Sequence, residues 1–140
     1  MFNPSRNQAR DFFFDAWRKY RGAVALSALE TIAVALVAEH PEYHALFDSR
    51  DKFIDRDYQP DAGETNPFLH LSMHMAIREQ IAIDQPLGVR AAHTRLSKER
   101  GSALAAEHEM MDCLGEMIWH AQRHQRAPDE AIYFACLAKK

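Results

Sequence analysis

The 140-residue sequence has little of what marks several large classes of protein. Its two cysteines, Cys113 and Cys136, are too few for a disulfide framework, so a reducing compartment is expected. Its formal net charge of −3 provides no basic surface for nucleic acid or for an anionic membrane. Residues 1–10 lack the charged start and the apolar stretch of a signal peptide. These absences predict a cytoplasmic protein that binds neither nucleic acid nor a membrane.

Long apolar runs, strand patterns and cofactor motifs are also missing. The most apolar run, residues 23–38, is shorter than the ~20 residues of a spanning helix and contains Glu30. There is no sustained apolar/polar alternation and no Asn-Gly or Asp-Gly hairpin turn. A Gly-rich phosphate loop, G-x-S-x-G and a paired C-x-x-C are absent, so no organic cofactor is predicted. Length and a hydrophobic share of 47% predict one domain with a sizeable core.

Helix signals, in contrast, are frequent. A capping box begins at Ser5, and Asn66 followed by Pro67 marks another helix start. We therefore predict an all-α fold, a single-domain helical bundle of about five to six helices over residues 1–140. The polar segment around residues 48–65 is predicted to be a mobile or functional loop, because it is longer than a typical connection. The expected helices cover residues 5–20, 27–39, 66–84, 86–100, 102–123 and 128 onward.

The unusual feature of the composition is a set of eight histidines. Three pairs are spaced i, i+4, whereas random placement gives about 0.4 such pairs. Four residues make one helical turn, so both side chains of a pair project from the same face. His70 and His74 share a stripe with Ile77 and Ile81, so this pair is predicted to point into the core. Neutral imidazole is a common ligand for transition metals, and one helix would here offer two nitrogens to one ion.

The other two pairs differ from this one in their surroundings. His40 and His44 lie on either side of Pro41, which disfavours a continuous helix. His40 lies on the apolar stripe of its helix, and it is either a metal ligand or a helix-end histidine. His120 and His124 lie away from the apolar stripe of their helix, so we interpret them as solvated residues without a structural role.

Carboxylates on apolar faces are the other candidate ligands. Glu107 lies in line with Met111, Leu114 and Ile118, where an acid is costly unless it is paired, hydrogen-bonded or metal-bound. Glu107 is therefore either a metal ligand or a cap at the start of its helix. His108 lies at the edge of the same apolar face and is a second candidate from this helix.

Two further residues have simpler interpretations. Glu30 completes a capping box with Ser27, which explains it without a metal. Cys113 is interpreted as a buried structural thiol, because nothing in the sequence marks it as activated.

Four segments carry a resemblance to a known family. They are FNPSR at residues 2–6, HPEYH at residues 40–44, NPFLHLSMHMAIREQ at residues 66–80 and EHEMMDCLGEMIW at residues 107–119. Together and in this order they resemble the domain of unknown function 1841 family of small proteobacterial proteins. The resemblance spans nearly the whole chain and implies a complete protein, but it implies no activity, substrate or site residues. The arrangement is also similar, more loosely, to hemerythrin-like and DinB-like bundles, which hold metals with histidines and acids from several helices.

These observations lead to a metal-site hypothesis. His70 and His74 are expected to bind zinc, iron or manganese together with Glu107 or His108 and with His40 or His44. An open coordination position would make the protein a metal-dependent hydrolase or a small-molecule binder. The alternative is a metal-free helical protein that acts by contact with a protein partner or as a homo-oligomer, with structural histidines in its core.

Overall fold

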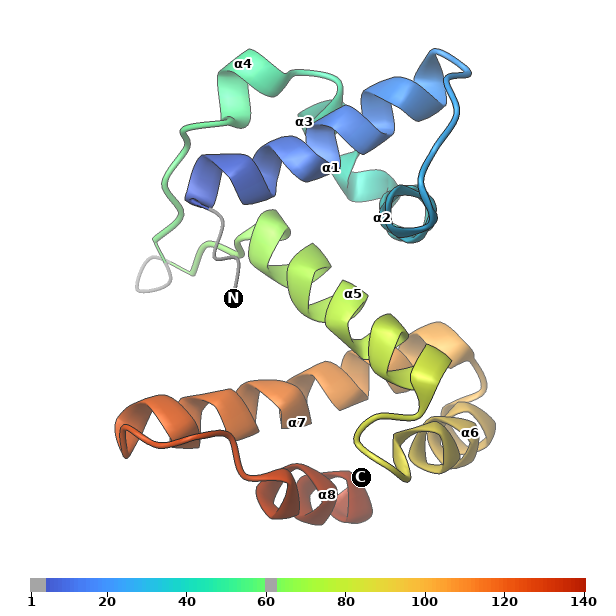
Figure 1. Ribbon diagram of the computed structural model, residues 1–140, viewed down its shortest axis with the longest axis vertical. Coiled ribbons are helices and arrows are strands. Elements are labelled where there is room, and N and C mark those ends of the chain that lie inside the picture. The colour runs from blue at the N-terminus through green and yellow to red at the C-terminus, as the bar shows by residue number, and fades with distance from the viewer. Residues whose placement is uncertain (1–4, 60–62) are drawn as a thin grey trace. The chain divides into compact units, whose positions relative to one another are not determined.

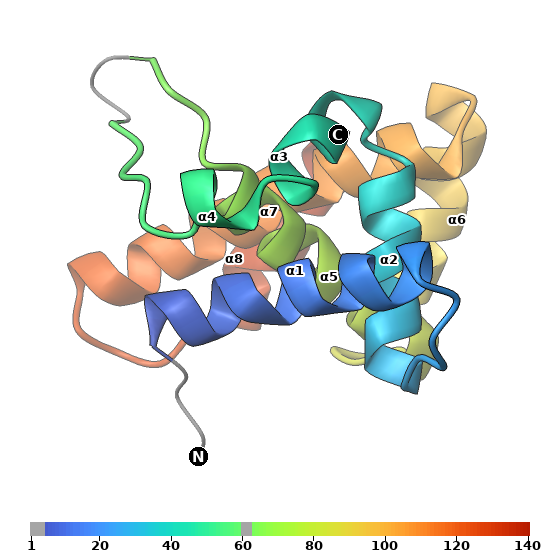
Figure 2. The same cartoon turned by 90° about the horizontal axis from the view of Figure 1, so that it is seen from above.

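The computed structural model describes residues 5–59 and 63–140, and these residues are all-helical as predicted (Figures 1 and 2). They form eight α-helices and one 3₁₀ helix, and no strand occurs among them. The predicted count of five to six helices is too low, because two helices of 4 residues each form between α2 and α5. The elements are α1 (Arg6–Arg21), α2 (Ala28–Ala38), the 3₁₀ helix η1 (Pro41–Tyr43), α3 (His44–Phe47), α4 (Arg50–Phe53), α5 (Pro67–Ile83), α6 (Val89–Arg100), α7 (Ala103–Arg123) and α8 (Glu130–Lys139).

The chain divides into two compact units, unit 1 over Met1–Met75 and unit 2 over Ala76–Lys140. The boundary falls inside α5, so the first part of this helix belongs to unit 1 and the rest to unit 2. The prediction of a single domain over residues 1–140 stays a prediction. Within the part of the chain that the structure describes, no helix has the length and apolar character needed to cross a membrane.

Unit 1 begins with two helices whose starts follow directly from the sequence. Ser5 and Gln8 form a reciprocal capping box at the start of α1, and Ser27 and Glu30 form another at the start of α2. Glu30 therefore has the capping role predicted for it, and Lys19 also pairs with its carboxylate at 2.8 Å. Figure 1 looks along α2 while α1 runs across the view, so these two packed helices cross steeply.

Aromatic side chains dominate the core of unit 1. Phe14 contacts both Phe47 and Phe68, with ring centroids 5.2 and 5.6 Å apart. Tilted contacts of this kind are the favoured geometry for aromatic pairs. These contacts hold the segment that carries α3 and the start of α5 against α1. The other large buried residues in this cluster are Phe13, Trp17, Val34, Leu36, Val37, Leu46, Ile54, Leu71 and Met75.

One cation, Arg10, lies inside this aromatic core with 3% of its surface exposed. Its Nη1 donates to the main-chain carbonyls of Ile54 at 3.0 Å and Arg56 at 2.7 Å, with a longer contact to Phe53 at 3.5 Å. Its guanidinium carbon lies 4.6 Å from the ring centre of Phe68. Burial is the main cause that lowers the pKa of Arg10, yet an arginine remains charged at any ordinary pH.

The segment between α2 and α5 is more ordered than the sequence indicated. Pro41 opens η1, and α3 follows it without a gap, so the break predicted at this proline is confirmed. The loop predicted around residues 48–65 contains the short helix α4. Residues 60–62 of that predicted loop lie outside the described residues.

Unit 2 is built around α7, which has 21 residues and packs against both α6 and α8. Gly101 ends α6 with a φ of +82°, a conformation that favours glycine, and Ser102 caps α7 immediately afterwards. Helix α6 begins at Val89 and not at the predicted Pro86. The buried stripe of α7 contains Met110, Met111, Leu114, Met117 and Ala121, whereas Ile118, which was predicted on the same face, is half-buried.

A disulfide joins Cys113 on α7 to Cys136 on α8. The interpretation of Cys113 as a free thiol is therefore wrong. The two residues are 23 positions apart, and the packing of α8 along α7 brings their Cα atoms to 5.5 Å, within the range that a disulfide spans. Disulfides persist mainly in oxidising environments. The bond therefore gives no support to the predicted reducing, cytoplasmic location, which stays a prediction.

Candidate metal centre

Helix α5 places two of the predicted ligands, His70 and His74. Asn66 starts the helix, because its side-chain oxygen accepts from the amides of Phe68 at 3.0 Å and Leu69 at 3.2 Å. This start fixes the helical phase, and one turn then separates the two imidazoles on the same face. His74 is completely buried and His70 is half-buried, so the prediction that this pair points inward is confirmed.

The third histidine, His40, follows α2 and has 3% of its surface exposed. Its Nδ1 lies 2.6 Å from the main-chain oxygen of Leu36. A carbonyl oxygen only accepts, so Nδ1 carries the proton and donates this bond. In the neutral ring, Nε2 then carries the lone pair. This arrangement, in which the second ring nitrogen is held by a carbonyl, is usual for histidines that bind metals.

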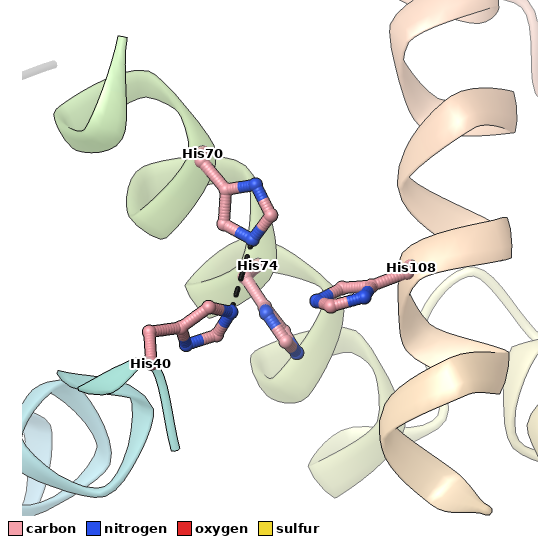
Figure 3. Close-up of side chains that lie close together, drawn as sticks. All are labelled: His40, His70, His74 and His108. Atoms are coloured by element: carbon pink, nitrogen blue, oxygen red, sulfur yellow. Dashed lines mark hydrogen bonds between the residues drawn. The ribbon is translucent and has the colours of Figure 1, made fainter. Parts of the chain in front are cut away.

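The three imidazoles converge within unit 1. Each ring offers one nitrogen, and these nitrogens lie within 4.8 Å of one another. The Nε2 atoms of His40 and His70 lie 3.1 Å apart. The ring centre of His40 lies 4.9 Å from that of His70 and 5.4 Å from that of His74, with both rings nearly perpendicular to it. Figure 3 shows the ring of His40 reaching from the end of α2 toward the two rings of α5.

An aromatic ring flanks this cluster. Tyr43 of η1 stacks on His40, with ring centroids 5.6 Å apart and planes inclined by 6°. The same ring meets His70 edge-on at 6.1 Å. Burial, together with the nearby charge of Glu42, raises the pKa of Tyr43, so its phenol stays neutral at physiological pH. The contact restricts the orientation of the His40 ring without adding a charge.

The distances suit a metal ion with nitrogen ligands. Two nitrogens bound at about 2.0–2.1 Å to a tetrahedral zinc ion are roughly 3.3 Å apart. The 3.1 Å between the Nε2 atoms of His40 and His70 is close to this separation. A separation of 3.1 Å also allows a hydrogen bond between one protonated and one unprotonated nitrogen. The arrangement can therefore hold a proton or a metal ion between these two rings.

His44, the other candidate beside Pro41, has different contacts. Its Nε2 donates to the carbonyl oxygen of Val37 at 2.9 Å. Its ring lies 5.0 Å from the ring of Trp17. These contacts tie the end of α2 to α3, so the structure favours a structural role for His44. The group of converging nitrogens does not include this residue.

Glu107 and His108 lie on α7, in unit 2. Glu107 has 5% of its surface exposed, which confirms the prediction that this acid lies on a core face. Its carboxylate accepts from Arg78 Nε at 3.0 Å and lies 3.1 Å from His93 Nε2. His108, which Figure 3 also draws, is half-buried. Metal binding by Glu107 or His108 stays a prediction from the sequence.

Two residues that contact the candidate ligands, Tyr43 and His93, were not predicted from the sequence. Tyr43 lies three positions after His40, where η1 lets the two rings stack, but no sequence pattern identifies a 3₁₀ turn there. His93 belongs to no i, i+4 pair, so its spacing predicts no role for it. A charged residue on the core face of α7 was the available signal, because a buried carboxylate requires a partner from another helix.

The comparisons with known proteins give a family and no activity. No curated protein and no solved structure matches the chain. Residues 5–139 match the family described as "Domain of unknown function (DUF1841)". This match covers nearly the whole sequence, including every residue of the histidine cluster. The chain therefore belongs to the DUF1841 family.

Proposed function

We propose that the protein binds one transition-metal ion through the imidazoles of His40, His70 and His74. The observation that carries the proposal is the convergence of three ring nitrogens of unit 1 within 4.8 Å, two of them on buried residues. Burying the imidazoles of His40 and His74 costs free energy unless their polar atoms are satisfied. A shared metal ion satisfies all three at once, because each neutral ring contributes one lone pair.

The donor set bears on the identity of the metal. Imidazole nitrogen suits zinc and iron, whereas manganese prefers carboxylate and water oxygens. Of the three metals expected from the sequence, zinc and iron(II) are therefore favoured by these three residues. The bond from His40 Nδ1 to the Leu36 carbonyl supports the proposal further, since it directs the Nε2 lone pair toward His70.

Three protein ligands leave a coordination position for water. A zinc ion held by three histidines supplies a bound water of lowered pKa, which is a nucleophile at neutral pH. This capacity supports the more specific proposal that the protein is a metal-dependent hydrolase or a small-molecule binder. The three histidines would hold the ion. The buried position of His74 and the ring of Tyr43 stacked on His40 would limit the access of water to it.

Elemental analysis of the untagged protein tests the proposal. We expect about one transition-metal ion per chain, and its loss in the double variant His70→Ala, His74→Ala. The matched control is His120→Ala, His124→Ala, which removes two histidines of the same spacing from α7 and must leave the metal content unchanged. Far-UV circular dichroism establishes that each variant folds. Chelation of the wild-type protein and readdition of zinc or iron(II) provides a second measurement that needs no variant.

The competing hypothesis is a metal-free protein that acts by contact with a partner. In that case His70 Nε2 donates to His40 Nε2 across the observed 3.1 Å, and the rings are hydrogen-bonded core residues. Absence of metal after reconstitution with zinc and with iron(II) would contradict our proposal and support this alternative.

The predicted contributions of Glu107 and His108 are tested separately. Single variants Glu107→Gln and His108→Ala are titrated with zinc and compared with His44→Ala. Replacing a residue that ligates the ion should lower the zinc affinity by about 10-fold or more. If His44→Ala weakens zinc binding as strongly as His40→Ala does, our assignment of His44 to a structural role is wrong.

A further inference from the structure

A small cavity lies at the C-terminal end of α7, and the histidine cluster of unit 1 contributes nothing to it. Its volume is about 170 Å³. That is below the ~300 Å³ at which pockets for drug-sized ligands begin, so it suits one chemical group better than a whole metabolite. Its apolar lining includes Ala121 and Ile132, and its polar lining consists of His120, His124, Arg126 and Asp129.

The end of α7 explains why the basic side chains gather there. His120 and His124 are one turn apart, and their rings are inclined by only 13° with centroids 6.2 Å apart. Gln125 then adopts a φ of +49°. Its amide donates to Gln122 and the amide of Arg126 donates to Ala121, which is the Schellman arrangement of a helix end. This turn brings Arg126 back beside the two imidazoles.

Hydrogen-bond donors outnumber acceptors among the polar side chains of the lining, since Arg126, His120 and His124 all carry N–H groups and Asp129 is the one carboxylate. Within residues 5–59 and 63–140, Arg126 forms no ion pair. The one acid of the lining, Asp129, accepts from the amide of Ala131 at 2.9 Å and caps α8. One guanidinium and two imidazoles therefore face a cavity whose carboxylate already serves the backbone. This differs from the sequence-based interpretation of His120 and His124 as residues without a role.

We propose that this cavity binds a phosphate-type oxyanion. The Arg126 guanidinium presents paired N–H donors that match two oxygens of such a group. Ring N–H groups of His120 and His124 supply further donors, and Ala121 and Ile132 form an apolar wall beside them. The proposal is independent of the metal site, because it uses residues of unit 2 alone.

Titration of the full chain with inorganic phosphate in an anion-poor buffer tests this proposal. Amide and histidine-ring NMR signals report the position of binding, and we expect saturable shifts confined to residues around the cavity. Arg126→Gln is expected to weaken binding at least ~10-fold, since a charge-assisted, bidentate contact is lost. The double variant His120→Gln, His124→Gln is expected to weaken it further when combined with Arg126→Gln.

The matched control is Arg123→Gln, which removes the same charge three residues earlier. The Arg123 guanidinium lies over the ring of Trp119 at 5.1 Å and does not line the cavity. Equal loss of affinity in Arg123→Gln and Arg126→Gln would overturn the proposal, since attraction to the general charge would then explain binding. Absence of saturable shifts would overturn it too. Unchanged phosphate binding in the His70→Ala, His74→Ala variant is expected, and loss there would assign the anion to the metal site instead.

Parallel titrations with phosphoserine and with adenosine monophosphate identify the source of the group. Tighter binding of either compound than of free phosphate supports the proposal and names the larger ligand. Equal binding of all three supports a site for the phosphate group alone.

Discussion

Among the described residues, each unit buries one arginine or carboxylate side chain, and the two units neutralise these charges by different means. In unit 1, Arg10 is held by main-chain carbonyls and the face of Phe68. In unit 2, Glu107 is held by the side chains of Arg78 and His93. The difference follows from where free backbone groups occur, because carbonyls are unpaired at a helix C-terminus whereas amides within a helix are already bonded. A buried cation can therefore use the end of α4, whereas Glu107, on the second turn of α7, requires donors from other helices.

The largest effect is expected from Arg10→Met, which keeps the aliphatic stem and removes the donors. The carbonyls of Ile54 and Arg56 then lose their buried partner, and the free energy of unfolding should fall by about 4 kcal/mol. Urea unfolding followed by the fluorescence of the buried Trp17 measures this, with the exposed Trp119 replaced by Phe in both proteins. Arg6→Met is the control, since Arg6 pairs with Asp57 at the surface and should contribute less than about 1 kcal/mol. If both variants lose a similar free energy of unfolding, the hydrogen bonds from Arg10 to main-chain carbonyls do not have the stabilising role assigned to them.

Unit 2 has a covalent connection that unit 1 lacks, because both cysteines of the sequence lie in α7 and α8. Replacing Cys113 and Cys136 with Ser should lower the free energy of unfolding by about 3 kcal/mol, since the unfolded chain regains the freedom of a closed loop. Chemical unfolding with and without a reducing agent checks this, and reduction should have no effect on the double variant. Two free thiols in the unreduced wild-type protein would contradict the disulfide.

Glu107→Gln is the counterpart of the Arg10 variant and should have a smaller effect, about 2 kcal/mol. The amide oxygen still accepts one hydrogen bond, and the Arg78 side chain is 23% exposed, so water partly compensates its lost partner. Urea unfolding followed by far-UV circular dichroism gives the value. The exposed Glu116→Gln on the same helix should change stability by less than about 0.5 kcal/mol. If Glu107→Gln loses more free energy of unfolding than Arg10→Met, the expected order of the two buried charges is wrong.

A neutral buried group gives the smallest expected effect. Tyr133 is fully buried and donates to Gln80 at 2.8 Å, so Tyr133→Phe should cost about 1 kcal/mol. Burial raises the pKa of Tyr133 well above its usual value of 10.0. Above that pH the unfolded chain loses a proton that the folded chain keeps, so stability falls as pH rises. Unfolding curves across the alkaline range should show a steeper decline for wild type than for Tyr133→Phe, and equal declines would contradict this.

Local signals in the sequence were sufficient to predict several helix starts, among them those of α1 and α5, and two of the converging histidines. Ser5 and Asn66 act within one turn of the backbone they cap, so their effect is readable without tertiary structure. The same holds for His70 and His74, whose common face follows from helical geometry alone. His40 was predicted as a candidate because it lies on the apolar stripe of its helix.

Features that depend on contacts between distant segments could not be predicted in this way. Cys113 and Cys136 meet only because α8 packs along α7. His93 and Arg78 reach Glu107 from positions 14 and 29 residues away, and no periodicity links them. His40 and His44 have the same spacing as His70 and His74, yet Pro41 breaks the helix between them and sends their rings to different partners.

The bond between His40 and Leu36 makes position 40 a place where folding and ligand binding can be separated. The amide of His40 donates to Val37, and the imidazole takes over the Leu36 carbonyl that an amide four residues on would normally occupy. The side chain thus continues the hydrogen-bond ladder of α2 beyond its last turn, a task that leucine is unable to perform. Asparagine places an N–H donor where the Nδ1 of histidine stands but offers nothing at the position of Nε2. His40→Asn should therefore preserve the end of α2 and abolish metal binding, whereas His40→Leu should disturb both.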